Sequence, residues 1–290
     1  MRSVIYRIPF LLLLFGLIAC EKQQVPIITP KPGTVSLSLS CQGATVIDFE
    51  TGTELYGMSS SYPMVPASMT KVMTMYIVFD RIDKGFLTLN TKIPVSEYAA
   101  MRSVNPGESN VPLNETETYS IDELIAALCV VSGNACAVAL GEFLSGGTES
   151  DFAGIMNHYA DSLQLTAHYT DASGLSDGNS VSPKSMALLT RDFIRRFPVI
   201  LTYTSMTGLN FRGENYSATN GLLPGKSYAY NGCDGFKTGY TNAAGLCITA
   251  TAQLGGKRVI AVVMKAPTSV LRYRDAATLM DYGLTTLLNQ

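Results

Sequence analysis

The chain has 290 residues, a formal net charge of −2, 15% charged residues and 47% hydrophobic residues. This length and apolar content allow one large buried core or two small ones, and they exclude a disordered protein. The sequence has no basic run, so it does not favour binding to nucleic acid or to an anionic membrane surface.

The N-terminus has the pattern of a secretory signal. Arg2 and Arg7 precede the apolar run IPFLLLLFGLIA. This run is shorter than the roughly 20 residues that a spanning helix needs. The run ends in LIAC, similar to the cleavage box of bacterial lipoproteins, and this resemblance implies a lipid on Cys20; the alternative is an ordinary signal peptide with an incidental cysteine. We expect residues 1–19 to be a signal peptide, residues 20–34 a lipidated tether, and the protein to be exported and held on a membrane, facing the periplasm or the outer cell surface.

The next part of the chain predicts two strands followed by helices. Alternating and β-branched residues favour strands at Ser36–Asp48 and Thr53–Met58. The helical segments that follow share an apolar helical pattern, in some cases with a capping signal. They are expected at Pro66–Lys84, from the capping box Ser120–Glu123 to Val131, at Ala135–Leu144, at Ser150–Leu163 and at Pro183–Arg196.

The pattern changes near Gly208, after which strands return. They are expected at Gly232–Thr238, Leu246–Leu254 and Lys257–Lys265, and a last helix at Tyr273–Leu288. The whole order predicts an α+β fold, in which the early and late strands join in one five-stranded antiparallel sheet flanked by helices. The central helices, at about residues 85–205, would form an all-helical lobe inserted in the α/β lobe of a domain that spans residues 35–290. A cleft between two lobes is a common place for a site.

Several classes of enzyme lack their usual residues. The two histidines, His158 and His168, do not form a metal-binding pair, and there is no phosphate-binding loop. No nucleophile elbow with a matching histidine is visible. The sequence therefore disfavours a zinc hydrolase, a histidine-based serine hydrolase and a nucleotide enzyme, and we expect no metal and no organic cofactor.

Five cysteines follow the tether, namely Cys41, Cys129, Cys136, Cys233 and Cys247. An exported chain can form disulfides, but an odd number leaves at least one thiol unpaired. Cys129 and Cys136 lie in apolar helical patterns, where cysteine is commonly a small hydrophobe. The sequence predicts no particular pairing.

A serine and a lysine remain as candidates for chemistry. In a helix, Ser68 and Lys71 lie one turn apart on the same face, and Ser68 would sit in the first turn near free amide groups. A lysine is a poor base at its ordinary pKa of about 10.4, but desolvation or a second cation lowers that pKa. A neutral Lys71 could then take the proton of Ser68. By itself the pattern is weak, because Ser-x-x-Lys occurs about once per chain by chance.

Two further motifs strengthen this hypothesis. Ser132-Gly133-Asn134 separates two predicted helices, and Lys237-Thr238-Gly239 ends a predicted strand. Lys-Thr-Gly occurs by chance in fewer than about one chain in ten. All three motifs occur in a sensible order and at sensible structural positions, so an accidental combination is disfavoured.

The set resembles the active-site serine penicillin-binding proteins and serine β-lactamases, and more closely the low-molecular-mass D-alanyl-D-alanine carboxypeptidases. The resemblance runs from about Ser38 to Leu284. The matching segments are VIDFETGTELY, PASMTKVMT, LCVVSGNACAVAL, the ASGL loop at Ala172–Leu175, TNGLLPG, DGFKTGYTNAAG and the late Arg272 and Arg274. The resemblance implies a β-lactamase/penicillin-binding-protein-like transpeptidase fold, with residues 35–290 as a serine D,D-peptidase domain.

The resemblance also implies catalytic roles. Ser68 would be the nucleophile and Lys71 its general base. Ser132 would relay a proton between Lys71 and the leaving amine, and Asn134 would bind the substrate peptide. Lys237 would add a second positive charge that keeps Lys71 neutral.

Substrate binding would use the end of the same late strand. By resemblance, Lys237 and Thr238 bind the terminal carboxylate, and the backbone amides of Ser68 and Tyr240 form the oxyanion hole. The strand that contains Gly239 could pair with an extended peptide. The implied reaction removes the terminal D-alanine from peptidoglycan stem pentapeptides through an acyl-enzyme on Ser68, and β-lactam antibiotics would acylate the same residue.

The chain departs from the family pattern at two places. Relatives often have an aspartate where this chain has Ala135, and many have a His-Ser pair where it has Ser180-Val181-Ser182. These departures bear on deacylation more than on acylation. Arg212 matches either a carboxylate-binding arginine of some relatives or an ordinary surface arginine.

Three other functions stay open. A D,D-endopeptidase would use the same residues on peptidoglycan cross-links. A β-lactamase would need a glutamate-held water, but no glutamate lies between Ala167 and Asp177. A non-catalytic penicillin-binding lipoprotein would form a stable adduct on Ser68 without releasing D-alanine.

Overall fold

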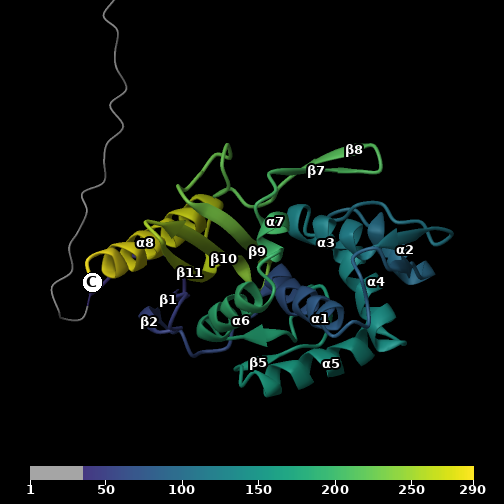
Figure 1. Cartoon of the computed structure of the whole chain (residues 1–290), viewed down its shortest axis with the longest axis horizontal. Coiled ribbons are helices and arrows are strands. Elements are labelled where there is room, and N and C mark those ends of the chain that lie inside the picture. The colour runs from purple at the N-terminus through teal and green to yellow at the C-terminus, as the bar shows by residue number, and fades with distance from the viewer. Residues whose placement is uncertain (1–34) are drawn as a thin grey trace, which may run out of the picture.

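The computed structural model describes residues 35–290 (Figure 1). The predicted signal peptide, the tether and Cys20 lie outside the described residues. In the part of the chain that is described, no helix is both long and apolar enough to span a bilayer. Lipidation of Cys20 therefore stays a prediction.

One five-stranded antiparallel sheet organises the fold, as the sequence predicted. Its strands lie in the order β2–β1–β11–β10–β9. They are β1 (Gly43–Asp48), β2 (Glu54–Met58), β9 (Cys233–Thr241), β10 (Gly245–Leu254) and β11 (Lys257–Ala266). Pairing of β1 with β11, with Gly43 opposite Met264, joins the early hairpin to the late strands.

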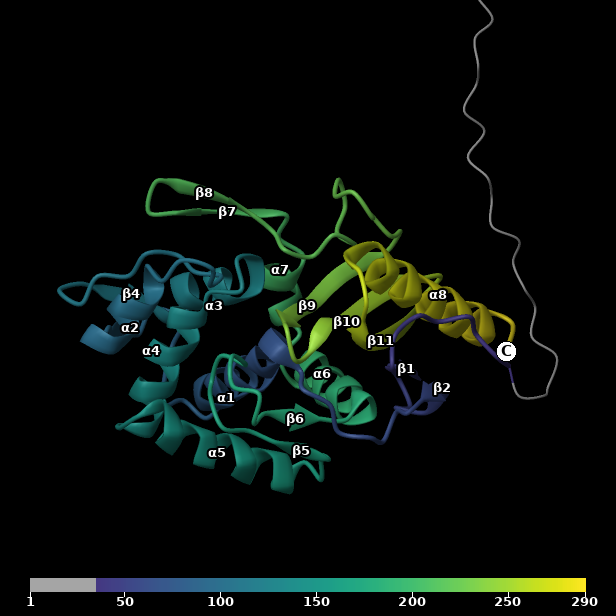
Figure 2. The same cartoon turned by 180° about the vertical axis from the view of Figure 1, so that it is seen from behind.

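Each face of the sheet has its own core, because side chains alternate between the faces of a strand. On β1, Val46 packs in the core beneath α8 (Ser269–Leu288), while Ile47 packs in the core that contains α1 (Lys71–Asp83) and α6 (Pro183–Arg196). The sheet therefore lies between α8 on one side and α1 with α6 on the other (Figures 1 and 2).

The helical lobe packs around one side of α1 (Figure 2). Its main helices are α2 (Glu97–Ser103), α3 (Ile121–Val130), α4 (Asn134–Ser145) and α5 (Glu149–Ser162). Several short elements were not predicted, because they hold too few residues to show a periodic pattern. They are α2, α7 (Ile200–Thr204), and the pairs β3 (Lys92–Pro94) with β4 (Thr118–Ser120), β5 (Ala167–His168) with β6 (Ser180–Val181), and β7 (Gly208–Phe211) with β8 (Glu214–Ser217).

The first strand is shorter than predicted. We expected Ser36–Asp48, but β1 begins at Gly43. Before it, the backbone N–H groups of Ser40 and Cys41 donate to Asp275 of α8 at 2.7 and 2.9 Å. This segment is thus fixed by a buried carboxylate of the last helix, which no local pattern reveals.

Two helix predictions also need correction. The helical lobe expected at about residues 85–205 includes α6, but α6 packs against β1 and β11, so it belongs with the sheet. The last helix begins at Ser269 rather than Tyr273, because Thr268 caps it by accepting the N–H of Leu271 at 3.2 Å.

The predicted capping signals are confirmed. Ser120 accepts the N–H of Glu123, and Glu123 accepts the N–H of Ser120 at 2.7 Å, so α3 begins with a complete capping box. Ser182 caps α6, with Pro183 at its first position. Local hydrogen-bond chemistry therefore sets where these helices begin.

The five cysteines of the described chain are all buried and unpaired. Burial raises the pKa of the Cys129 and Cys136 thiols to about 12. Thiols with such high pKa values are inert, so these two side chains act as small hydrophobes.

We predict that Asp275→Ala lowers the free energy of unfolding by about 3 kcal/mol, because two backbone N–H groups lose a charged and buried acceptor. Asp275 is completely buried and also contacts the Arg274 guanidinium at 3.1 Å. Urea unfolding measures the change. The exposed Asp161 of α5 supplies the control, since Asp161→Ala should change stability by less than about 0.5 kcal/mol; equal effects of both substitutions would refute the role of Asp275.

Candidate active site

Ser68 lies in a short 3₁₀ turn, η1 (Ala67–Thr70), directly before α1. The sequence predicted it in the first turn of an α-helix, and that detail was wrong. Ala67 has φ +50°, which a right-handed α-turn does not contain, so the regular helix begins only at Lys71. Ser68 is partly exposed, while its neighbours Ala67 and Met69 are fully buried. The serine is thus presented outward from a buried turn.

Two glycines let distant segments pack closely on this turn. A Cβ at Gly174 of the ASGL loop would lie 1.9 Å from the carbonyl oxygen of Ala67. A Cβ at Gly239 of β9 would lie 2.6 Å from the carbonyl oxygen of Pro66. Neither distance is physically possible, so a side chain at either position would push its segment away from Ser68. The close packing of β9 on this turn therefore explains why the third residue of the Lys-Thr-Gly motif is a glycine.

Lys71 is fully buried beside Ser68. Its Nζ donates to the Oγ of Ser68 at 2.9 Å, to the Oδ1 of Asn134 at 2.6 Å and to the carbonyl oxygen of Ser173 at 2.5 Å. Burial lowers the pKa of Lys71 to about 7, although the nearby negative charge of Asp171 and of other acidic groups opposes this shift. We expected desolvation or a second cation to lower this pKa, and desolvation is the leading cause.

These three contacts suit a general base. A charged lysine has three N–H donors and no acceptor, so it can serve all three oxygens. A neutral amine keeps two N–H donors, for Asn134 and Ser173, and its lone pair then faces the hydroxyl of Ser68. Loss of one proton from Lys71 therefore leaves it positioned to accept the Ser68 proton.

The second and third motifs meet next to this pair. Ser132, in the short link between α3 and α4, accepts a hydrogen bond from Lys237 Nζ at 2.8 Å. Lys237 is buried, and both burial and the charge of Lys71 lower its pKa well below the ordinary value. Ser132 was expected to contact Lys71, yet its bonded partner is Lys237. Asn134, expected to bind substrate, is in turn bonded to Lys71.

Strand β9 brings the remaining predicted residues to the edge of the sheet. It pairs with β10 on one side and is the last strand of the sheet. Thr238 donates from Oγ1 to Oγ1 of Thr219 at 3.0 Å, and the side chain of Tyr240 is 60% exposed. The buried Arg272 adds positive charge near Lys237. The open edge thus carries hydroxyls and cations suited to a peptide with a terminal carboxylate.

The loop that contains Asp171 and Ser173 also binds Lys71, and the sequence did not predict this contact. Asp171 accepts the N–H of Gly174 at 2.6 Å, the N–H of Ser176 at 2.8 Å and the side-chain amide of Asn179 at 2.8 Å. These bonds tie the loop into one conformation and aim the carbonyl of Ser173 at Lys71. The ASGL segment was noted only as part of the resemblance, and nothing local signals that its backbone serves a lysine.

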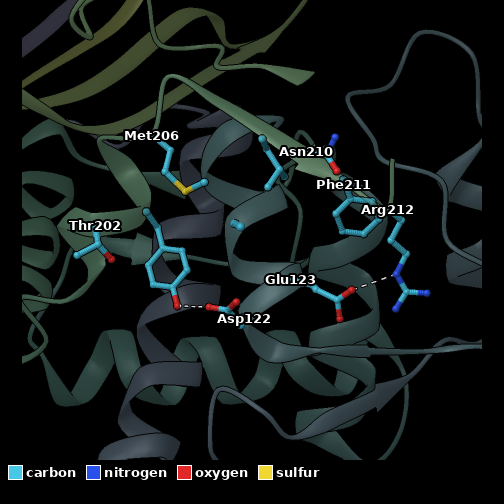
Figure 3. A pocket seen from close by; sticks show the side chains of 10 residues that line it. Asp122, Glu123, Thr202, Met206, Asn210, Phe211 and Arg212 are labelled. Carbon is cyan, nitrogen blue, oxygen red and sulfur yellow. Dashed lines mark hydrogen bonds and ion pairs between the residues drawn. The ribbon is translucent and has the colours of Figure 1, made fainter. Parts of the chain in front are cut away.

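Arg212 lies beside Glu123 and Phe211 at a cavity of its own (Figure 3). Its guanidinium binds Glu117 and, at 3.0 Å, Glu123, and it lies over the ring of Tyr119. It thereby fixes the β7–β8 hairpin to α3 and β4. These contacts favour a structural role for Arg212 over a role in binding a carboxylate.

The cavity beside Arg212 has a volume of about 400 Å³, and no residue of the three motifs lines it. Its carboxylates already have partners: Tyr203 donates to Asp122 at 2.5 Å, and Arg212 pairs with Glu123 (Figure 3). A second cavity of about 280 Å³ is also lined without Ser68. Neither cavity marks the candidate site, which is defined by the contacts of the motif residues.

Both histidines are exposed and lie outside these contacts, His158 in α5 and His168 in β5. Within residues 35–290, no group of three or more His, Cys, Asp or Glu side chains could hold a metal ion.

The chain is similar in sequence to known proteins. The family model for D-alanyl-D-alanine carboxypeptidases, peptidase S11, matches residues 30–268. The D-alanyl-D-alanine carboxypeptidase DacF of Bacillus subtilis (strain 168) is 32% identical over 265 residues, which cover 87% of this chain and 64% of DacF. The chain therefore spans slightly less than two thirds of the length of this relative.

Solved structures resemble the fold as a whole. Penicillin binding protein 6B from Escherichia coli has a TM-score of 0.80 and 32% identity, covering 88% of this chain and 79% of its own. Penicillin-Binding Protein D2 from Listeria monocytogenes, in the ampicillin-bound form, has a TM-score of 0.76 and 31% identity, covering 86% of this chain and 100% of its own. The chain belongs to the D-alanyl-D-alanine carboxypeptidase family, peptidase S11.

Proposed function

We propose that this protein is a serine D-alanyl-D-alanine carboxypeptidase, which removes the terminal D-alanine from peptidoglycan stem pentapeptides through an acyl-enzyme on Ser68. The observation that carries the proposal is the 2.9 Å contact between Lys71 Nζ and Ser68 Oγ, made by a fully buried lysine. Membership of the carboxypeptidase family supports the same reaction.

Acylation begins with neutral Lys71. Its lone pair takes the hydroxyl proton of Ser68 while Ser68 Oγ attacks the carbonyl carbon between the two D-alanines. A new C–O bond forms, and the carbonyl oxygen becomes negative. The N–H groups of Ser68 and Tyr240 would stabilise this oxyanion, at about 3 kcal/mol for each fixed donor.

The leaving amine then needs a proton. Ser132 Oγ accepts its bond from Lys237, so its own hydroxyl hydrogen is available to the amine nitrogen. The C–N bond breaks, and D-alanine leaves with the proton of Ser132. Lys71 no longer faces a Ser68 hydroxyl, so its amine would turn to Ser132 Oγ and give up its proton there, which restores both groups. Water then attacks the ester, with Lys71 again as base, and releases Ser68.

The carboxylate of the substrate would bind at Lys237 and Thr238. A carboxylate there favours the charged form of Lys237, and this positive charge in turn favours neutral Lys71. The peptide would lie along the free edge of β9, where its backbone can pair with the strand. β-Lactam antibiotics would acylate Ser68 by the same attack, and the ampicillin-bound form of the Listeria protein supports this proposal.

We further propose export and attachment to a membrane through acyl chains on Cys20. The charged start, the short apolar run and the LIAC box support this proposal. The site would then face peptidoglycan outside the cytoplasm.

We predict that the wild-type protein gains one penicillin adduct on Ser68 and releases D-alanine from a D-Ala-D-Ala peptide, and that Ser68→Ala abolishes both. Lys71→Met should slow acylation by about 10³-fold, because the base is lost. Mass spectrometry reads the adduct and the product together. Release of D-alanine by Ser68→Ala would refute the mechanism. Cleavage of cross-linked dimers in preference to pentapeptides would instead support an endopeptidase. Rapid hydrolysis of the penicillin adduct would support a β-lactamase.

The rate of acylation should depend on pH through Lys71. Only the neutral amine accepts a proton, so kcat/KM should rise with pH and reach a plateau above the pKa of about 7 that burial gives Lys71. At pH 5 the rate should be about 100-fold below the plateau. Stopped-flow measurement with a chromogenic β-lactam gives the profile, and a rise centred near pH 10 would contradict a buried neutral base.

In a bacterial host that processes lipoproteins, Cys20→Ser should move the protein from the membrane fraction to the soluble exported fraction. Metabolic labelling with radioactive palmitate should mark the wild-type chain and leave the variant unlabelled, since the acyl chains need this thiol. Cys41→Ser is the matched control, because Cys41 is buried in the fold. Equal labelling of the wild-type and Cys20→Ser chains would rule out this anchor.

A further inference from the structure

The side-chain amide of Asn134 lies between Lys71, which donates a hydrogen bond to it, and Glu108, which accepts one from it. Its Oδ1 accepts from Lys71 Nζ at 2.6 Å, and its Nδ2 donates to Oε2 of Glu108 at 3.2 Å. Asn134 is 2% exposed, so water does not satisfy either end. An amide has one acceptor atom and one donor atom, and a carboxylate at the donor end fixes which end faces Lys71.

Glu108 is itself firmly held. Its Oε2 accepts from Nη2 of Arg102 at 2.9 Å, and its Oε1 accepts from the amide of Asn105 at 2.7 Å. Burial raises the pKa of this carboxyl, but the bonds to Arg102, Asn105 and Asn134 outweigh burial and hold the pKa below its ordinary value. Glu108 therefore stays ionised and accepts hydrogen bonds only.

The loop that carries Glu108 is attached to the start of α4. The N–H of Asn134 donates to the carbonyl of Ser109 at 2.8 Å, and the N–H of Ala135 donates to Oδ1 of Asn110 at 2.8 Å. The two residues that follow Glu108 are thus bound to the first two residues of α4. The hydrogen bonds between these two segments therefore hold Glu108 next to Asn134.

We propose that Glu108 is a positioning residue for the Ser68–Lys71 pair: it orients Asn134 so that Oδ1 faces Lys71, and Arg102 keeps Glu108 in place. The inference rests on the proposed function, because Lys71 is its base. It gives a role to a carboxylate that lies outside the three motifs.

The orientation matters most when Lys71 is neutral. With Oδ1 toward Lys71, Asn134 occupies an N–H of the amine and leaves the lone pair for Ser68. If Asn134 turned over, its Nδ2 would donate to that lone pair and compete with the Ser68 proton. Glutamine at position 108 permits this reversal, because its amide can supply a donor to Asn134 Oδ1.

Glu108 also contributes to the charge around Lys71. The ionisable groups that face Lys71 are Asp171, Cys136, Glu149, Glu108 and Lys237. Each negative charge raises the pKa of Lys71, so loss of the charge at Glu108 should lower it.

The test compares Glu108→Gln with Glu115→Gln, which removes the same charge from an exposed residue of the same segment between α2 and β4. Glu108→Gln should reduce kcat/KM for acylation about 10- to 100-fold, because a catalytic group is misplaced. It should also move the rising limb of the pH profile to lower pH. Glu115→Gln should leave both unchanged. Glu108→Asp keeps the charge but shortens the reach to Asn134, so it should lower the rate without shifting the profile.

A second readout needs no turnover. NMR titration of protein labelled with ¹³C-lysine, with the Lys71 signal assigned by its loss in Lys71→Arg, should show a lower pKa for Lys71 in Glu108→Gln than in Glu115→Gln. If the wild type fails to acylate, the proposed function fails, and the titration still tests Glu108. An unchanged pKa of Lys71 in Glu108→Gln, or an unchanged acylation rate in an active protein, would overturn the inference.

Discussion

An amine taken out of water is the constraint on which this site depends. Burial of a charged lysine is costly, so the molecule must give it acceptors or let it lose its proton. Here Lys71 receives three acceptors and also titrates near neutrality. It can therefore exist in both protonation states without rearrangement of its surroundings, which is what a base that works in repeated cycles requires.

The acceptors come from parts of the chain that are far apart in sequence. Asn134 lies 63 residues from Lys71, and Ser173 lies 102 residues away. The central position of α1, between the sheet and the helical lobe, is what allows these segments to reach one side chain (Figure 1). The two-lobed arrangement thus serves to enclose a polar group that no single element could satisfy.

The sequence was sufficient where the signals are local. The long strands, the capping box at Ser120 and the start of α6 follow from periodicity and from hydrogen bonds within a few residues. It was insufficient where a contact joins distant segments. The segment before β1 bonds to Asp275 of the last helix, and the turn that carries Ser68 packs closely against Gly174 and Gly239.

The same limit applies to the site. The motif residues could be named because the combination of three motifs in this order is unusual, but their partners could not. The bond from Lys237 to Ser132, the carbonyl of Ser173 and the carboxylate of Glu108 all depend on tertiary structure. A single sequence contains no pattern that links position 108 to position 134.

The free side of β9 limits which chains can bind there. A strand edge binds only a chain that offers unsatisfied backbone groups in an extended form, and folded proteins have already paired theirs internally. A compact, folded chain would therefore find no pairing at this edge, whereas an extended peptide with free backbone groups would.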